Sequence, residues 1–496
     1  MPTTGNLPKS TSNNVPHSAL ERMVRNYTDT HLPQYPIISA DMLEQTLEQF
    51  QRESLSDYDT SMATSLPESA GAGHFEFFVL FIVLAISAST LTWKAETQAR
   101  EACDSFYKSA LKHLQLLEGY NEMMELQISL LLAHFAHMCP ELVDNWTCIS
   151  NAVRIVLSLG LYRECSEALD AEQKTLRTGL FWVTYGMERS LCTNLRLPLS
   201  FPEEAITIKL DDPAPEISNP LFTADDLKKK SSANHIYRYR MLETEVHRVL
   251  YLEEELLIFG FASVEEWLND ISGRLEAWYA EAQSYTPYNM LEFKHVQLHH
   301  LIARIYRPTP RLRTKSPQDW DIVLRSSRKL IDDYVGQESR RRLFYPWHGV
   351  HILFETAIIA LDASWCARDY PHLISDARNM VQTHIPQCLQ LLGAIGERWN
   401  EATECVNKLN PLVQKVSLAF SGAPASIYDP TIAEEINALL FSDRPATMTG
   451  PGLEDFGFEG DSFFLDHVLG DDMDFLQWGA DWAIMPVEIF PSEQLP

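Results

Sequence analysis

Two histidines four residues apart, His295 and His299, are the best-spaced pair for metal chemistry in the sequence. On a helix this spacing places both imidazoles on one face, where they could share a metal ion. The stretch has no glutamate as in H-E-x-x-H zinc sites, and no third ligand is evident. The sequence therefore favours structural histidines here, and His134 and His137 receive the same interpretation.

A magnesium-dependent all-α enzyme would need acidic residues spaced along helices. Asp332 and Asp333 are adjacent, but Glu338 lies five residues beyond the pair instead of three. The stretch 269–276 resembles a second metal motif of terpene cyclases, yet it is one residue short and precedes the acidic pair. No phosphate-binding loop and no G-x-S-x-G motif occurs. A catalytic triad assembled only by the fold stays open, but the sequence predicts no enzyme, no cofactor and no metal site.

The cysteines show no zinc-knuckle spacing, and we expect them to be buried free thiols. The eight are Cys103, Cys139, Cys148, Cys165, Cys192, Cys366, Cys388 and Cys405. A formal charge of −28, from 40 Lys and Arg against 68 Asp and Glu, argues against a basic nucleic-acid binder. The short basic stretches 227–230, 307–315 and 340–342 are predicted to be solvated faces or helix ends, with 307–315 also a candidate nuclear import signal.

Helical periodicity dominates from Leu20 to about Phe420, after a polar stretch at 1–19 that we predict to be disordered. A polar loop is expected at about 55–73. The apolar run Phe77–Trp93 follows, and it is shorter than the roughly twenty apolar residues that a membrane span needs. It therefore predicts a buried core helix.

The centre of the chain reads as two helices and a turn. Ile149, Val153 and Val156 belong to one apolar face, and Gly160 stands where a left-handed helix cap is expected. Asp170 can cap the next helix, with Gln173 three residues later. In the second half we predict helices at 233–258, 264–284, 291–306, 317–335, 347–367, 372–399 and 400–420.

This central stretch resembles the fungal-specific transcription factor domain, or middle homology region, of zinc binuclear cluster regulators. "SLGLYR" contains Gly160 and Arg163, and "LRTGLFWVTYGMERSL" contains Phe181, Trp182, Tyr185 and Arg189. "LRLPLSF" keeps Pro198, but Arg196 and Leu197 replace the family's Gly and Arg. Weaker similarities extend over about 20–420.

The resemblance implies an α-helical domain used for regulation, effector response or dimerisation. On physical grounds, Phe181 and Trp182 are expected to bury a large area between helices, and Arg189 to need a carboxylate or carbonyl partner. Such regulators normally begin with a six-cysteine zinc cluster, and no cysteine precedes Cys103. Direct DNA binding by these residues is therefore not expected.

The segment 445–496 contains no Lys or Arg and alternates acidic with aromatic residues, a composition typical of disordered activation regions. A partner groove could take its apolar side chains on a short induced helix. The candidates are Phe463, Phe464, Leu465, Val468, Leu469, Phe475 and Trp478.

These features together predict an all-α, multi-helix regulatory domain at 20–420, a linker at 421–444 and an acidic activation tail. The expected function is that of a nuclear, pathway-specific transcription activator, acting through coactivators or the transcription machinery. The expected partners also include a DNA-binding regulator or a second copy of the chain. No association with a membrane is expected. An all-α enzyme or small-molecule binder, with a pocket among the central helices, is the alternative.

Overall fold

The computed structural model describes residues 16–56, 73–91, 96–117, 119–164, 169–210, 224–285, 294–421 and 431–442. Within these ranges the regular elements are all helices, and no strand occurs. This confirms the predicted all-α class.

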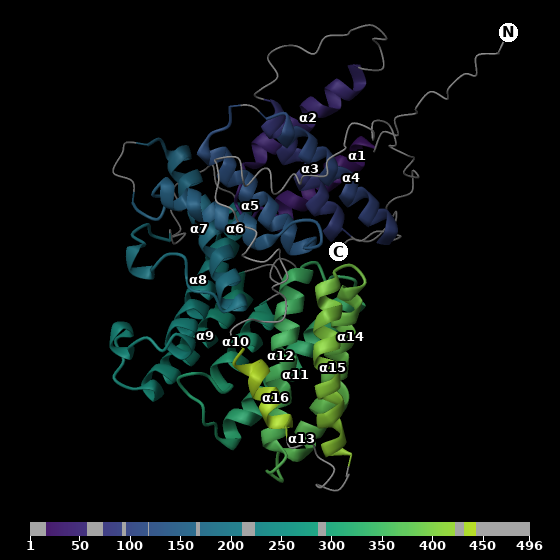
Figure 1. Ribbon diagram of the computed structural model, residues 1–496. Coiled ribbons are helices and arrows are strands. Elements are labelled where there is room, and N and C mark those ends of the chain that lie inside the picture. Colours follow the sequence, from purple (N-terminus) through teal and green to yellow (C-terminus); the bar gives the residue numbers. More distant parts are fainter. Residues whose placement is uncertain are drawn as a thin grey trace, which may run out of the picture.

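The helices form three consecutive groups along the chain (Figure 1). The first comprises α1 (His17–Asn26), α2 (Ala40–Ser56), α3 (Gly73–Thr90), α4 (Glu96–Gln115), α5 (Glu122–Met138) and α6 (Asn145–Ser158). The second comprises α7 (Ala171–Leu195), α8 (Ala224–Val246), α9 (Val264–Tyr285) and α10 (Lys294–Tyr306). The third comprises α11 (Pro317–Ser339), α12 (Pro346–Ala367), α13 (Ile374–Asn379), α14 (Ile385–Gly396), α15 (Asn400–Phe420) and α16 (Ile432–Leu440). In Figure 1 the first group lies at the top and the third at the lower right, with α7 to α10 along the other side.

Two helices, α3 and α12, are long and apolar enough by length and composition to cross a membrane. Most of each apolar window is buried inside the fold, 72% for α3 and 83% for α12. In α3 every residue from Phe78 to Ala88 is buried, and the helix packs against α4 and α5. A helix that is apolar on all sides is expected at the centre of a large core, so the predicted buried core helix is confirmed.

The buried side chains form two hydrophobic cores. The larger joins the first group, α7 and the third group, and the smaller gathers α8, α9 and α10 around Trp267 and Trp278. Seven of the cysteines lie among the described residues, and all seven are free thiols. Six of the seven are buried, as expected, whereas Cys366 is only half-buried. Cys165 lies outside the described ranges.

The turn between α6 and α7 has the predicted caps. Gly160 adopts φ +62°, and the Leu161 amide donates to the Val156 carbonyl at 3.0 Å, which closes the last turn of α6. Asp170 accepts a bond from the Gln173 amide at 2.7 Å and begins α7. The sequence identified both positions because these caps depend on local chemistry alone.

We expect Gly160→Ala to lower the free energy of unfolding by about 1 kcal/mol, because a Cβ is strained at positive φ although nothing would touch it. Gly273→Ala is the matched control. Gly273 lies inside α9 with no atom within 4 Å of an added Cβ, so this change should stabilise by up to about 1 kcal/mol. Urea denaturation followed by circular dichroism measures both, and equal effects of the two variants would contradict this account.

The structure corrects several predicted boundaries. The stretch 421–444, predicted as a linker, contains α16, whose Ile432, Ile436 and Leu440 form a buried stripe at four-residue spacing beside α12. Helix α1 begins at His17, within the stretch predicted to be disordered, because Ala19 and Leu20 are buried. The helix expected at 233–258 begins earlier, at Ala224, and passes at its end into a π-helical turn at His247–Tyr251. The helix expected at 372–399 is divided into α13, a π-helical turn and α14. Residues 57–72 of the predicted loop and the whole tail at 445–496 lie outside the described residues.

Candidate functional site

The aromatic residues of the central motif lie on α7 and are fully or almost fully buried. Phe181 and Trp182 meet edge to face with ring centroids 5.0 Å apart, and Trp182 stacks on Tyr237 of α8 at 5.9 Å. The Trp182 indole N–H donates to the Lys209 carbonyl at 3.3 Å. As predicted, the pair buries a large area between helices, and it joins α7 to α8.

Arg189 lies about two turns beyond Trp182 along α7 and is completely buried. Its guanidinium contacts the Glu188 carboxylate at 2.5 Å and donates to Glu203 at 3.1 Å and to the Phe201 carbonyl at 2.8 Å. Tyr185 donates its hydroxyl to the same Glu203 carboxylate at 3.0 Å. The predicted carboxylate or carbonyl partners of Arg189 are therefore present. The contacts with Phe201 and Glu203 hold the segment that follows α7 against the helix.

The remaining motif residues lie elsewhere. Gly160 forms the cap of α6 described above, whereas Arg163 and Pro198 are exposed. Arg163 stacks over Tyr162, with the guanidinium carbon 4.7 Å from the ring centroid. The motif thus divides into buried residues on α7, which hold neighbouring segments together, and exposed residues in the turns. The predicted activation residues of the tail lie outside the described ranges.

Arg196 ends α7 in a left-handed conformation, with φ +55°. This is the position at which an arginine replaces the glycine of the family's motif. A non-glycine residue in this region costs free energy, and side-chain contacts hold it there. The Arg196 guanidinium donates to the carbonyls of Leu440 at 3.1 Å and Ser442 at 2.6 Å, and it lies 3.5 Å from Glu355.

Glu355 of α12 is the centre of a buried ion-pair network. It contacts Arg196 and Arg307 at 3.5 Å, Arg304 at 3.6 Å and the His300 imidazole at 3.0 Å. Burial acts to raise the pKa of Glu355, but Arg304, the hydrogen bond to His300, and Arg307 outweigh it and hold the pKa well below its ordinary value. The carboxylate is therefore ionised at neutral pH.

A second buried pair extends this network to α8. Arg240 contacts Glu243 at 2.6 Å, and Glu243 lies 3.7 Å from Arg304. The Arg240 side chain is 9% exposed and Glu243 is 2% exposed. Four arginines and two glutamates thus form one chain of contacts linking the end of α7, α8, α10 and α12.

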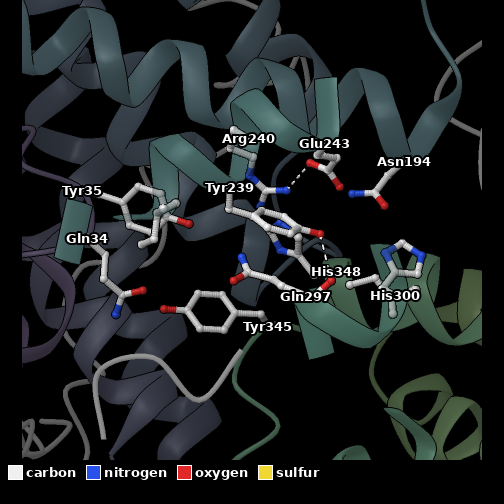
Figure 2. Close-up of a pocket in the computed structure, with 12 residues that line it drawn as sticks. Gln34, Tyr35, Asn194, Tyr239, Arg240, Glu243, Gln297, His300, Tyr345 and His348 are labelled. Atoms are coloured by element: carbon white, nitrogen blue, oxygen red, sulfur yellow. Dashed lines mark hydrogen bonds and ion pairs between the residues drawn. The ribbon is translucent and has the colours of Figure 1, made fainter. Parts of the chain in front are cut away.

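A cavity of about 50 Å³ lies beside this network and is partly open to solvent. Its lining is Gln34, Tyr35, Asn194, Ile236, Tyr239, Arg240, Glu243, Gln297, His300, Tyr345, His348 and Ile352. In Figure 2, Gln34 and Tyr35 lie on one side and Asn194 and His300 on the other, with Arg240, Tyr239 and His348 between them. The first group, α7, α8, α10 and α12 all contribute walls.

The polar groups of the cavity are fixed by neighbours. His348 shares a hydrogen bond with Ser190 at 3.1 Å, and burial holds the pKa of His348 well below its ordinary value, so it is neutral. Tyr239 donates its hydroxyl to the Gln297 carbonyl at 3.2 Å. Arg240 differs from these groups because its Nε has no hydrogen-bond partner among the described residues. The cavity therefore offers a held cation, amide and hydroxyl groups and aromatic walls.

The candidate metal residues do not come together. His295 is bonded to the Tyr279 hydroxyl at 2.7 Å, and Asp333 accepts a bond from Gln337 at 2.9 Å. Asp332 is half-exposed and lies 3.4 Å from His384. Throughout the described ranges, no three His, Cys, Asp or Glu side chains are grouped so as to hold a metal ion.

The basic stretch 307–315 is not the solvated face that its composition suggested. Arg307 is buried and donates to the Tyr251 hydroxyl at 2.9 Å, and Arg311 donates to the Val249 carbonyl at 2.7 Å. These side chains satisfy buried acceptors inside the fold. Arg240, Glu243 and Glu355 were not among the predicted site residues, although the carboxylates at 355 and 362, seven residues apart within an apolar run, were a usable signal.

Comparison with known proteins supplies the family context. A family model described as the fungal specific transcription factor domain matches residues 24–280, a little over half of the chain. The pyrimidine pathway regulatory protein 1 of Saccharomyces cerevisiae is 24% identical over 64% of this chain. Protein STB5 of the same yeast is 21% identical over 70%, and the positive regulator of purine utilization of Emericella nidulans is 21% identical over 53%. The matches cover 36%, 49% and 33% of these relatives, so the chain spans about a third to half of their length.

Proposed function

The chain belongs to the family of proteins with the fungal specific transcription factor domain, and on that premise we propose that it is a nuclear activator of a specific pathway. The family identifies a transcription regulator and makes an enzyme unexpected. Pathway specificity is supported by two relatives, whose names refer to the pyrimidine pathway and to purine utilization. A biosynthetic gene set is the pathway class that we propose.

The observation behind activation is the composition of 445–496. Its carboxylates alternate with Phe463, Phe464, Phe475 and Trp478, and no Lys or Arg neutralises them. Mutual repulsion of the charges opposes collapse onto the aromatics, which keeps apolar side chains accessible to a coactivator groove. We propose coactivators or the transcription machinery as the partners of this segment.

We expect residues 445–496, fused to an unrelated DNA-binding domain, to activate a reporter gene. Alanine at Phe463, Phe464, Leu465, Val468 and Leu469 should lower reporter output at least about fivefold, because few apolar anchors supply most of the binding energy at such interfaces. Alanine at Ser462, His467, Gln477 and Ser492 is the matched control and should stay within about twofold of the parent fusion. A fusion that stays silent at equal expression would remove the main support for activation.

The proposed route to DNA is indirect. These 496 residues contain no six-cysteine zinc cluster, and Arg307 and Arg311 of the basic stretch 307–315 point inward instead of offering their charge to DNA. We propose that a DNA-binding regulator, as a partner chain or an additional domain, brings the activator to its promoters. Chromatin precipitation before and after depletion of such a partner tests this route.

A second candidate function, small-molecule binding, is favoured by one observation. The cavity beside Arg240 has walls from α7, α8, α10 and α12 and contains a buried cation with an unbonded N–H. Concave sites with few convergent polar groups are the usual form of ligand pockets. This function is compatible with regulation, because a ligand there would contact residues from all three groups of the fold.

A further inference from the structure

We propose that the cavity beside Arg240 is a binding site for a short acyclic carboxylate, whose carboxylate group pairs with the Arg240 guanidinium at its unbonded Nε–H. The proposal concerns binding alone and stands independently of activation by the tail. Any regulatory effect of the ligand would rest on the proposed function above.

The buried network carries more positive than negative charge. Within the described part of the chain, Arg196, Arg240, Arg304 and Arg307 share two carboxylates in direct contact, Glu243 and Glu355. Asp362, also near Arg307, is only partly ionised at neutral pH because burial raises its pKa to about 7. A buried cation without a matching anion is costly, so the network is short of negative charge.

The position of Arg240 at the cavity suits a carboxylate ligand. Among the four arginines, Arg240 is the one that lines the cavity (Figure 2). Its Nη1 contacts Glu243 at 2.6 Å, and its Nε has no hydrogen-bond partner among the described residues. A guanidinium presents its donors in a fixed arrangement, so a carboxylate in the cavity could accept from this Nε–H while Nη1 stays on Glu243.

The size and polarity of the cavity suit a short organic anion. An engineered cavity that holds benzene is about 150 Å³, and this cavity is about 50 Å³, so it favours a short ligand of about two to four carbon atoms over a ring. Ile236 and Ile352 offer apolar contact to such a short chain, and the Gln34, Asn194 and Gln297 side chains can bond to its polar substituents. An inorganic anion of similar size would make no use of the apolar walls.

Fluoroacetate and its neutral analogue fluoroacetamide are suitable probes because ¹⁹F line broadening reports weak binding directly. We expect the purified full chain to broaden the fluoroacetate signal with a dissociation constant near the millimolar range, as suits a ligand with so few atoms. Fluoroacetamide should be unaffected, and inorganic phosphate should displace fluoroacetate at least about tenfold less effectively than acetate does.

Arg240→Met should weaken fluoroacetate binding at least about tenfold, the loss expected for a charge-assisted bond. Arg238→Met is the matched control: Arg238 lies two residues away on α8, pairs with Glu281 at 3.0 Å and is not part of the cavity wall. It should change affinity by less than about twofold. If circular dichroism shows that Arg240→Met is unfolded, Ile352→Phe replaces it, because that variant keeps Arg240 and fills the cavity.

Three results would overturn the proposal. The first is the absence of broadening with the wild-type chain. The second is equal affinity in wild type and in the folded Arg240→Met or Ile352→Phe variant. The third is equal binding of fluoroacetamide, or of phosphate, which would show a site that does not select an organic anion. None of these readouts depends on reporter activation, so failure here and failure of the activator function are distinguishable.

Discussion

Glu355→Gln is expected to lower the free energy of unfolding by about 3–5 kcal/mol, one of the two largest effects of a single substitution in this chain. Glutamine keeps the size of the side chain but removes the charge that faces Arg196, Arg304 and Arg307 within 3.6 Å. The three arginines, which have little access to water, would then lose the carboxylate that they share. Urea denaturation monitored by tryptophan fluorescence measures the loss.

Asp321→Asn is the matched control, because Asp321 pairs with Arg325 at 2.8 Å on the exposed face of α11. Exposed pairs of this kind contribute at most about 0.5 kcal/mol. A similar loss in both variants would show that the network around Glu355 contributes no more than a surface pair.

The pH dependence of this effect has a defined sign. Burial acts to raise the pKa of Glu355, yet Arg304, His300 and Arg307 hold it well below the ordinary value of 4.5. A carboxyl with a lowered pKa in the folded state contributes stability that is fully present above the unfolded pKa and is lost as pH falls through the folded pKa. The difference between wild type and Glu355→Gln should therefore be constant near neutrality and shrink as the pH falls below about 4.5.

Arg189→Met is expected to have a comparable cost, about 3–5 kcal/mol, because it leaves the Glu188 carboxylate buried without its cation. Glu188 is 1% exposed and lies 2.5 Å from the Arg189 guanidinium. Methionine fills much of the volume, so the loss measures charge more than packing.

The double variant Glu188→Gln/Arg189→Met tests the cause. Removing both charges should recover more than about 1 kcal/mol relative to Arg189→Met alone, which a double-mutant cycle in urea would detect. Arg163→Met, at the exposed end of the same motif, should cost less than about 0.5 kcal/mol. If the double variant is less stable than Arg189→Met alone, the stability lost in Arg189→Met comes from packing and not from the unpaired charge.

Features that depend on neighbours in the sequence were predictable. Gly160 and Asp170 were identified because a left-handed cap and an N-terminal cap need only local chemistry. Arg189 was predicted to find a polar partner because a charge on an apolar helix requires one. The apolar run in α3 was assigned to the core on length alone.

Features that depend on the fold were not predictable. Arg240 and Glu243 have the spacing of an ordinary surface pair, three residues apart on a helix, and only the fold around α8 buries them. Glu355 and Arg307 are far apart in sequence, and no spacing rule joins them. Helix α16 was missed because its nine residues follow a polar stretch and look too short to stand alone.

The left-handed end of α7 has a mechanical consequence. There the Arg196 guanidinium donates to the carbonyls of Leu440 and Ser442 at the end of α16, while the same group faces Glu355. The end of α16 is thus held by the charged network as well as by the surfaces of α12 and α15. A change of charge at Glu355 would therefore be transmitted through Arg196 to the last residues of α16.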